Sequence, residues 1–133
     1  MYKAGFQYDS TYSYPDSPGF RNGMCHPFYP FNLETETSIK ILEIPLIFMD
    51  VSINLDLMSQ WKLVLFLLKV IKKNRGVFTI NFHNNTLSKY NPINYMKLYN
   101  NILKYGKDNN AWITNCNNVY GNYHKNFQTS IKL

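Results

Sequence analysis

The chain has 133 residues, of which 45% are hydrophobic, and a formal net charge of +6. This length suits one domain with a buried core, and this hydrophobic content excludes a disordered tail. The charge is compatible with a nucleic-acid partner, but the lysines are spread thinly along the chain. Their densest cluster, Lys72-Lys73-Asn74-Arg75, is typical of a helix C-terminus, where cations favour the helix dipole. We therefore do not expect nucleic-acid binding.

The cysteines and the apolar stretches say little about location. Cys25 and Cys116 stand in no CxxC arrangement, so a disulfide is neither required nor excluded. No signal peptide is visible at the start of the sequence. The longest apolar stretch, residues 61–71, contains two lysines and is too short to span a bilayer. We expect no membrane span, and the cytoplasm is the default location.

The first predicted element is a short strand over residues 4–8, which ends at Asp9-Ser10-Thr11. Residues 12–23 are rich in Pro, Gly, Asp and Ser, which is typical of a loop. The tyrosines in this segment and Phe20 indicate that the loop packs against the protein. A long ordered loop above a sheet is usually functional.

Residues 25–31 form an aromatic segment that contains two prolines. The prolines prevent a helix and interrupt any central strand. The four rings of this segment belong to His26, Phe28, Tyr29 and Phe31. Two interpretations stay open: the rings cover the end of a core, or they line a carbohydrate or aromatic pocket, since flat rings stack on the apolar faces of sugars.

Residues 41–53 are nearly continuously apolar, which is typical of a strand covered on both faces. Pro45 has no N–H to donate, so we expect a bulge or irregular pairing there. Asp50 is the one carboxylate late in this segment. It either faces the mouth of the strand or begins the exit turn.

Residues 57–74 carry the clearest helix signal, with Asp56 as N-cap. Apolar residues recur there at helical spacing: Trp61, Val64, Leu65, Leu68 and Ile71. Other apolar residues, Phe66 among them, widen this stripe, so we expect burial on more than one side. Gly76 follows, and residues 77–83, most of which are β-branched or aromatic, predict a strand that stops at His83. Residues 41–83 therefore predict one βαβ unit with parallel strands.

A second helix is predicted over residues 92–105. Asn91 suits its N-cap, Pro92 its first position, and Gly106 the position just past its end. Residues 111–114 predict one more short strand, and residues 126–133 a frayed tail.

His83 is the main candidate for chemistry, because parallel α/β folds place reactive groups at the carboxyl ends of their strands. The alternative is a histidine that only caps its strand. Asp9 also ends a predicted strand, on what should be the same face of the sheet. A carboxylate beside a histidine favours the imidazolium and makes a general acid near neutral pH. We therefore predict an Asp9–His83 pair.

A metal site within this chain is not expected. The three histidines show no HxxxH or HExxH spacing, and the sequence contains no Asp-Asp pair. Cys25 and His26 are adjacent, so in an extended segment they point in opposite directions and form no dyad. Cys25 acting with His83 stays open as an alternative.

Four blocks resemble, in order and spacing, the carboxyl-terminal part of a polysaccharide deacetylase. The family is carbohydrate esterase family four, in its bacterial surface-polysaccharide branch. The blocks are Tyr8-Asp9-Ser10-Thr11, residues 18–28 (PGFRNGMCHPF), residues 42–50 (LEIPLIFMD) and Phe82-His83-Asn84-Asn85. The resemblance covers residues 3–120. It implies an α/β fold, an irregular (β/α) barrel, and metal-dependent hydrolysis of N- or O-acetyl groups on a carbohydrate.

In this resemblance His83 matches a general acid that protonates the leaving group. Asp9 matches the carboxylate that supports this acid. The residues implied at the substrate are Arg21, Cys25, His26, Asp50 and Asn84. Many family members have Asp where this chain has Asn84.

The Asp-Asp and HxxxH blocks of the family, which supply the general base and the metal ligands, do not occur in this sequence. The resemblance therefore implies a partial deacetylase-like domain over residues 1–125. A divalent metal such as zinc belongs to the full-length family, and this chain alone is expected to bind none. Such a half-barrel is expected to be inactive alone, with an open edge that pairs with the missing amino-terminal half or with itself. The alternative is a non-catalytic carbohydrate-binding or interaction module that uses residues 26–31.

Overall fold

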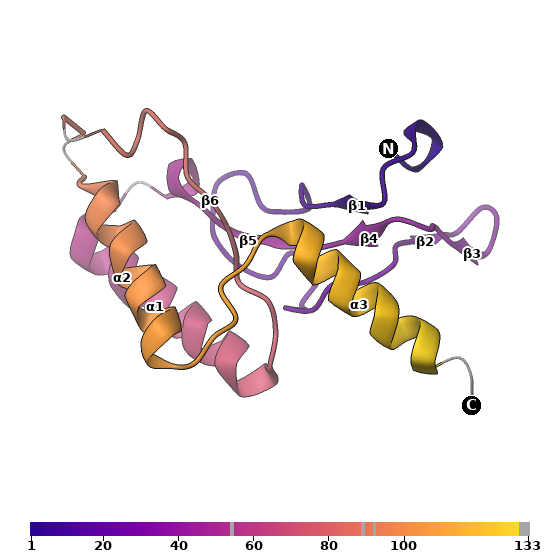
Figure 1. Ribbon diagram of the computed structural model, residues 1–133. Coiled ribbons are helices and arrows are strands. Elements are labelled where there is room, and N and C mark those ends of the chain that lie inside the picture. The colour runs from indigo at the N-terminus through magenta and orange to yellow at the C-terminus, as the bar shows by residue number, and fades with distance from the viewer. Residues whose placement is uncertain (54, 89, 92, 131–133) are drawn as a thin grey trace.

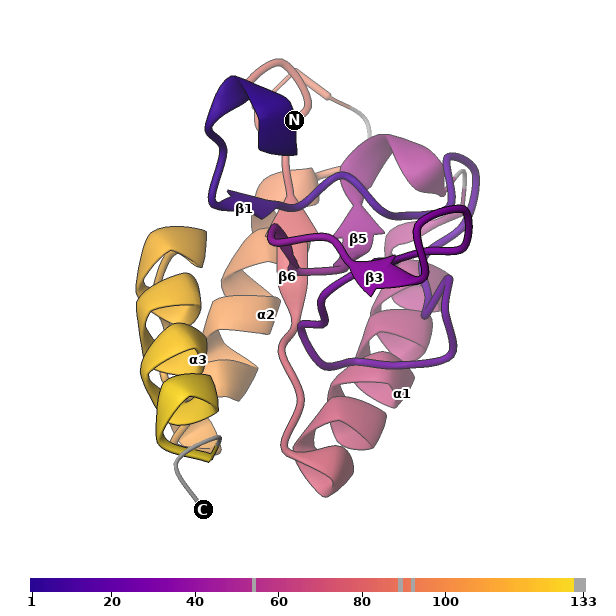
Figure 2. The ribbon, with the colours of Figure 1, turned by 90° about the vertical axis from the view of Figure 1, so that its right-hand side faces the viewer.

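The fold is known from a computed structural model that describes residues 1–53, 55–88, 90, 91 and 93–130, the last five by backbone alone. Helices α1 and α2 pack side by side next to strands β5 and β6 (Figure 1; Figure 2). Helix α3 lies next to the other strands, near β1 and β4. In chain order the elements are η1 (Tyr2–Ala4), β1 (Tyr8–Asp9), β2 (Phe31–Asn32), β3 (Thr37–Ser38), β4 (Leu42–Glu43), β5 (Leu46–Met49), η2 (Asp50–Ser52), α1 (Leu57–Asn74), β6 (Thr79–Asn81), α2 (Tyr95–Asp108) and α3 (Cys116–Ser130).

The predicted βαβ unit is present as β5, α1 and β6. Strands β5 and β6 are parallel, with Leu46 opposite Thr79 and Met49 opposite Asn81. The second strand is shorter than the predicted residues 77–83. The strands in the described part of the chain form three two-stranded sheets, with no closed barrel. Half of a deacetylase barrel therefore stays a prediction.

Pro45 divides the predicted strand over residues 41–53 into two strands. Upstream of it, β4 pairs in parallel with β1, with Leu42 opposite Tyr8 and Glu43 opposite Asp9. Downstream, β5 pairs with β6 instead. Because proline has no N–H, the ladder of β4 ends there. The predicted irregularity is thus confirmed, but it is a change of partner strand and not only a bulge.

The amino-terminal prediction is wrong in its extent. Residues 2–4 form the short helix η1, which ends at Gly5 with φ 85°. Only Tyr8–Asp9 of this region forms a strand. The hairpin of β2 and β3 was not predicted, and an isolated bridge joins Phe28 to Glu43.

Helix α1 has the predicted bounds. Asp56 caps it, because its Oδ1 accepts hydrogen bonds from the N–H groups of Met58 (2.9 Å) and Ser59 (3.1 Å). Arg75, at φ 54°, ends it in the left-handed conformation. The expected burial of Phe66 is wrong, since 62% of this residue is exposed.

Two apolar clusters lie on either face of β5, so this strand is buried on both faces as predicted. Ile47 packs with Cys25, Leu67 and Ile71. Phe48 belongs to the larger cluster, whose buried members are Phe48, Ile53, Val64, Leu68, Tyr95, Leu98 and Ile102. Neighbouring residues of a strand point to opposite faces, and α1 contributes to both clusters. The βαβ unit and α2 are thereby held as one body.

The carboxyl-terminal third differs from the prediction. Helix α2 begins at Tyr95 with Asn94 as its cap, and it includes Gly106, which was expected beyond its end. Pro92 lies outside the described residues. Residues 111–115 form no strand. Helix α3 was not predicted and runs past Asn126, where the frayed tail was expected, while residues 131–133 lie outside the described part.

Helix α3 is anchored to the strands by aromatic rings. The ring of Tyr120 lies 5.7 Å from that of Tyr8 in β1, between centroids. The first turn of α3 is capped by Asn115, whose Oδ1 accepts a hydrogen bond from the N–H of Asn118. Within the described ranges, no helix is both long and apolar enough to cross a membrane.

Candidate active site at the carboxyl ends of β5 and β6

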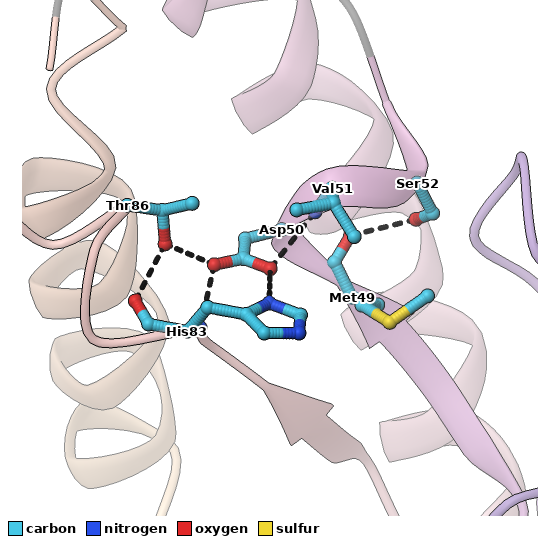
Figure 3. Close-up of polar contacts among 6 residues, drawn as sticks. All are labelled: Met49, Asp50, Val51, Ser52, His83 and Thr86. Atoms are coloured by element: carbon cyan, nitrogen blue, oxygen red, sulfur yellow. Dashed lines mark hydrogen bonds and ion pairs between the residues drawn. The ribbon is translucent and has the colours of Figure 1, made fainter.

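Asp50 and His83 meet where two parallel strands end (Figure 3). Asp50 follows β5 directly, and His83 comes two residues after β6. Parallel neighbours end at the same edge of a sheet, so the pairing of β5 with β6 brings these residues together. The site is therefore a product of the βαβ unit.

The carboxylate of Asp50 holds both the ring and the backbone of His83. Asp50 Oδ1 lies 2.6 Å from His83 Nδ1, and its Oδ2 accepts the His83 N–H at 2.7 Å. Oδ1 also accepts the N–H of Val51 at 2.8 Å. These contacts fix the orientation of the imidazole from two directions.

Thr86 closes the site from the turn after β6. Its hydroxyl contacts Asp50 Oδ2 and lies 2.7 Å from the carbonyl oxygen of His83. The Thr86 N–H donates to the same carbonyl at 3.1 Å. Sequence reasoning missed Thr86, although a threonine three residues after a strand-ending histidine is a familiar turn signal.

Burial and hydrogen bonding act in opposite directions on Asp50, which is 0% exposed. Burial opposes its ionisation, but hydrogen bonds from Thr86 and His83, and the charge of the imidazolium, prevail. The pKa of Asp50 is therefore lowered from its ordinary value, and the carboxylate is ionised at neutral pH.

The imidazole of His83 remains open to solvent, with 41% of its side chain exposed. Nδ1 faces Asp50, whereas Nε2 lies on the side of the ring away from the carboxylate (Figure 3). When a carboxylate accepts the proton of Nδ1–H, Nε2 is the nitrogen that exchanges protons with a substrate.

Asp9 is not the partner of His83, which corrects the predicted pair. Its carboxylate accepts hydrogen bonds from the Ser10 N–H (2.8 Å) and the Thr11 hydroxyl (3.0 Å). The reason is strand pairing. Asp9 lies opposite Glu43 in β4, on the amino-terminal side of Pro45. His83 follows the strand that pairs with β5, on the other side of Pro45.

Cys25 and His26, which the resemblance implied at the substrate, lie away from His83. The carbonyl of Cys25 accepts the N–H of Val77 at 2.7 Å, before β6 begins, whereas His83 lies beyond its other end. Both residues line a hollow against Val70 and Asn74 of α1. Burial raises the pKa of the Cys25 thiol, which disfavours a thiolate nucleophile. The Cys25–His83 alternative is therefore wrong.

Of the other predicted substrate residues, Arg21 lies in the loop between β1 and β2, and Asn84 lies next to His83. Arg21 donates to the Ser13 carbonyl at 2.8 Å, and its guanidinium carbon lies 4.6 Å from the Tyr12 ring centre. Asn84 is exposed in the turn directly after His83. Asp50 was expected at the substrate, but it is fully buried and its carboxylate contacts the ring and backbone N–H of His83 instead.

The residues at the site do not fit a metal ion. Across the described ranges, no three His, Cys, Asp or Glu side chains come together in a metal-binding group. Asp50 and His83 make only two, and both oxygens of Asp50 already accept hydrogen bonds. The chemistry of this chain is therefore derived from the Asp50–His83 pair alone.

No protein-family model matches the chain, and comparisons with curated proteins and with solved structures found no match either. The resemblance to a polysaccharide deacetylase stays a prediction from four sequence blocks.

Proposed function

We propose that this chain contributes the general-acid part of a carbohydrate deacetylase-like site. The observation that carries the proposal is the hydrogen bond between a fully buried carboxylate, Asp50, and the half-exposed imidazole of His83. This arrangement orients the ring and leaves Nε2 facing outward. The four sequence blocks supply the substrate class, which is an acetylated sugar.

The reaction is hydrolysis of an acetyl ester or amide. Water attacks the acetyl carbonyl carbon, and the bond between that carbon and the sugar oxygen or nitrogen breaks. Nε2–H of His83 gives its proton to the departing atom, and Asp50 stabilises the imidazolium before this transfer. The products are acetic acid, which releases its proton to solvent at neutral pH, and the free sugar hydroxyl or amine, and one proton of the attacking water replaces the one that His83 gave.

A second chain completes the site in this proposal, because the described residues offer no group to activate the water. The strands of the described residues form only two-stranded sheets, so each strand has an open edge whose backbone groups can pair with another chain. The partner in this proposal is an amino-terminal deacetylase half, since a second copy of this chain carries the same residues and supplies no such group.

Acetate release tests the proposal. An acetylated oligosaccharide and 4-nitrophenyl acetate are incubated with the wild-type protein and with His83→Gln, each mixed with an amino-terminal deacetylase half that carries the Asp-Asp and HxxxH blocks. Loss of a general acid costs about 10²–10⁴-fold in rate. The loss should be much larger for the sugar substrate, since 4-nitrophenolate leaves without a proton. Equal release by wild type and variant on the sugar contradicts the proposal.

A second candidate function, carbohydrate binding without hydrolysis, is favoured by the aromatic segment over residues 26–31. The Phe31 residue is 56% exposed. Phe28 packs edge-on against Tyr12, over which Arg21 lies, so rings gather on this side of the molecule. Phe31→Ala should then weaken oligosaccharide binding in calorimetry, while His83→Gln leaves it unchanged.

A further inference from the structure

Charge is divided unevenly along this chain. Residues 57–133 contain eleven Lys or Arg and a single acid, Asp108, which gives a net charge of +10. Residues 1–56 contain three Lys or Arg and seven acids, which gives −4. Residues 57–133 include the three helices α1, α2 and α3, and residues 1–56 include strands β1 to β5. Such an asymmetry points to a polyanionic partner on the helical side.

The outward face of α1 carries this charge together with apolar groups. Lys62, Lys69 and Lys73 are exposed and recur at helical spacing with Met58 and Phe66. Met58 is 68% exposed and Phe66 is 62% exposed. Helix α1 contains no acidic residue. Its exposed face is therefore both basic and apolar, although its other side is buried in the core.

Helix α2 extends the same character next to α1. Lys97, Lys104 and Lys107 are exposed on it, and among the described residues an acidic partner is found for Lys104 alone, which is Asp108 at 2.8 Å. Lys72 of α1 donates to Asn109, the residue after α2, at 2.8 Å and so ties the two helices together. The two helices lie side by side in both ribbon views (Figure 1; Figure 2).

We propose that the exposed face of α1 and α2 docks onto an anionic lipid surface. The lysines meet the headgroup charges, and the rings and thioethers of Phe66 and Met58 enter the boundary between headgroups and acyl chains. A nucleic-acid interface favours Arg and polar side chains, and α1 and α2 contain no arginine. A lipid surface therefore fits the mixture of Lys and apolar groups better.

The charge division also sets the orientation of the docked protein. The strand-rich segment, with its net charge of −4, is repelled by anionic headgroups and faces solvent. Each lysine near such a surface strengthens binding by about five-fold, so several act together. Salt weakens this attraction, since the Debye length is only about 8 Å at physiological ionic strength.

Vesicle co-sedimentation of the full chain tests the proposal and does not depend on His83. Vesicles of equal parts phosphatidylcholine and phosphatidylglycerol should bind the protein, and vesicles of phosphatidylcholine alone should not. The double variant Lys69→Glu/Lys73→Glu should lose at least about 25-fold in vesicle partitioning. Phe66→Ala should lose several-fold at every salt concentration.

The matched control is Lys3→Glu/Lys40→Glu, which makes the same change of net charge on the other segment, where both lysines are exposed. Retained vesicle binding by this control supports a specific face. An equal loss in both double variants, or no binding to the anionic vesicles, overturns the proposal. Binding of mixed-sequence duplex DNA at lower protein concentration than vesicles, in the same buffer, assigns the face to nucleic acid and overturns it as well.

Discussion

Glu43 and Asp50 are two buried carboxylates only seven residues apart, and their surroundings act on them in opposite directions. Glu43 is 5% exposed and Asp50 is 0% exposed. Burial raises the pKa of Glu43, and the nearby charge of Asp9 adds to this, while the amides of Tyr12 and Thr11 oppose it. Burial acts in the same sense on Asp50, but its hydrogen bonds outweigh it and lower the pKa.

The difference lies in what each carboxylate holds together. Asp50 receives donors from its own strand end and from the end of β6, so its charge stabilises the contact between two strands. Glu43 accepts the N–H of Tyr12 at 3.1 Å but lies opposite another acid, Asp9. Burial by itself therefore does not make a carboxylate useful, because the donors around it decide its ionisation.

Asp50→Ala should lower the free energy of unfolding more than any other change at these two carboxylates. It leaves the N–H groups of His83 and Val51 and the imidazole without their acceptor. Hydrogen bonds to charged groups contribute about 1.5–3 kcal/mol each to the free energy of unfolding, and Asp50 accepts several of them. Urea denaturation measures this cost, and Glu43→Ala is the matched truncation. Equal losses in the two variants contradict the difference drawn between the carboxylates.

The same cost should depend on pH. Because the pKa of Asp50 is lower in the folded state, its ionised form stabilises the fold above the unfolded pKa of about 3.9. This contribution disappears as pH falls through the folded pKa. The difference in unfolding free energy between wild type and Asp50→Ala should therefore shrink in acid.

Thr86→Val should have the next largest effect. Valine has nearly the same shape but no hydroxyl, so the buried carboxylate of Asp50 loses one donor. Hydrogen bonds to charged groups contribute about 1.5–3 kcal/mol to the free energy of unfolding. Thr86→Ser keeps the hydroxyl and is the control. A Thr86→Ser variant as unstable as Thr86→Val in urea would assign the effect to packing instead.

Local signals explain why α1 was predicted to the residue. The Asp56 cap, the apolar periodicity and the stop before Gly76 all lie within the helix or next to it. The βαβ unit follows from the same signals, since a helix between two strands implies parallel pairing. Helix α3 has weaker signals: Asn115 caps it, and Cys116, Val119, Tyr120 and Tyr123 recur at helical spacing, but polar Asn residues interrupt them. Its anchor is a distant ring, that of Tyr8, which lies outside the reach of local reasoning.

The partner of His83 was beyond local reasoning. Asp9 and Asp50 both end strands in the sequence, and choosing between them requires knowing which strand lies beside β6. Pro45 makes that choice, because it ends the pairing of β4 with β1 and leaves β5 to pair with β6. A proline read as a local irregularity therefore decides a contact between residues 33 positions apart.

Glu43→Gln should give the smallest effect, and one of opposite sign. The pKa of Glu43 is raised in the folded state, so folding favours its protonated form, and the fold loses stability as pH rises from the unfolded pKa of about 4.3 through the folded value. A neutral glutamine removes this penalty and should stabilise the protein by about 0.5–1 kcal/mol at neutral pH.

The gain from Glu43→Gln should vanish near pH 4 and below, where the carboxyl is protonated in both states. Glu34→Gln makes the same change of charge at an exposed position and should leave the unfolding free energy within about 0.5 kcal/mol of wild type. If both variants gain equally in thermal and urea unfolding, the net charge of the chain is responsible. If only Glu43→Gln gains, the two buried carboxylates of this segment differ in the donors that surround them.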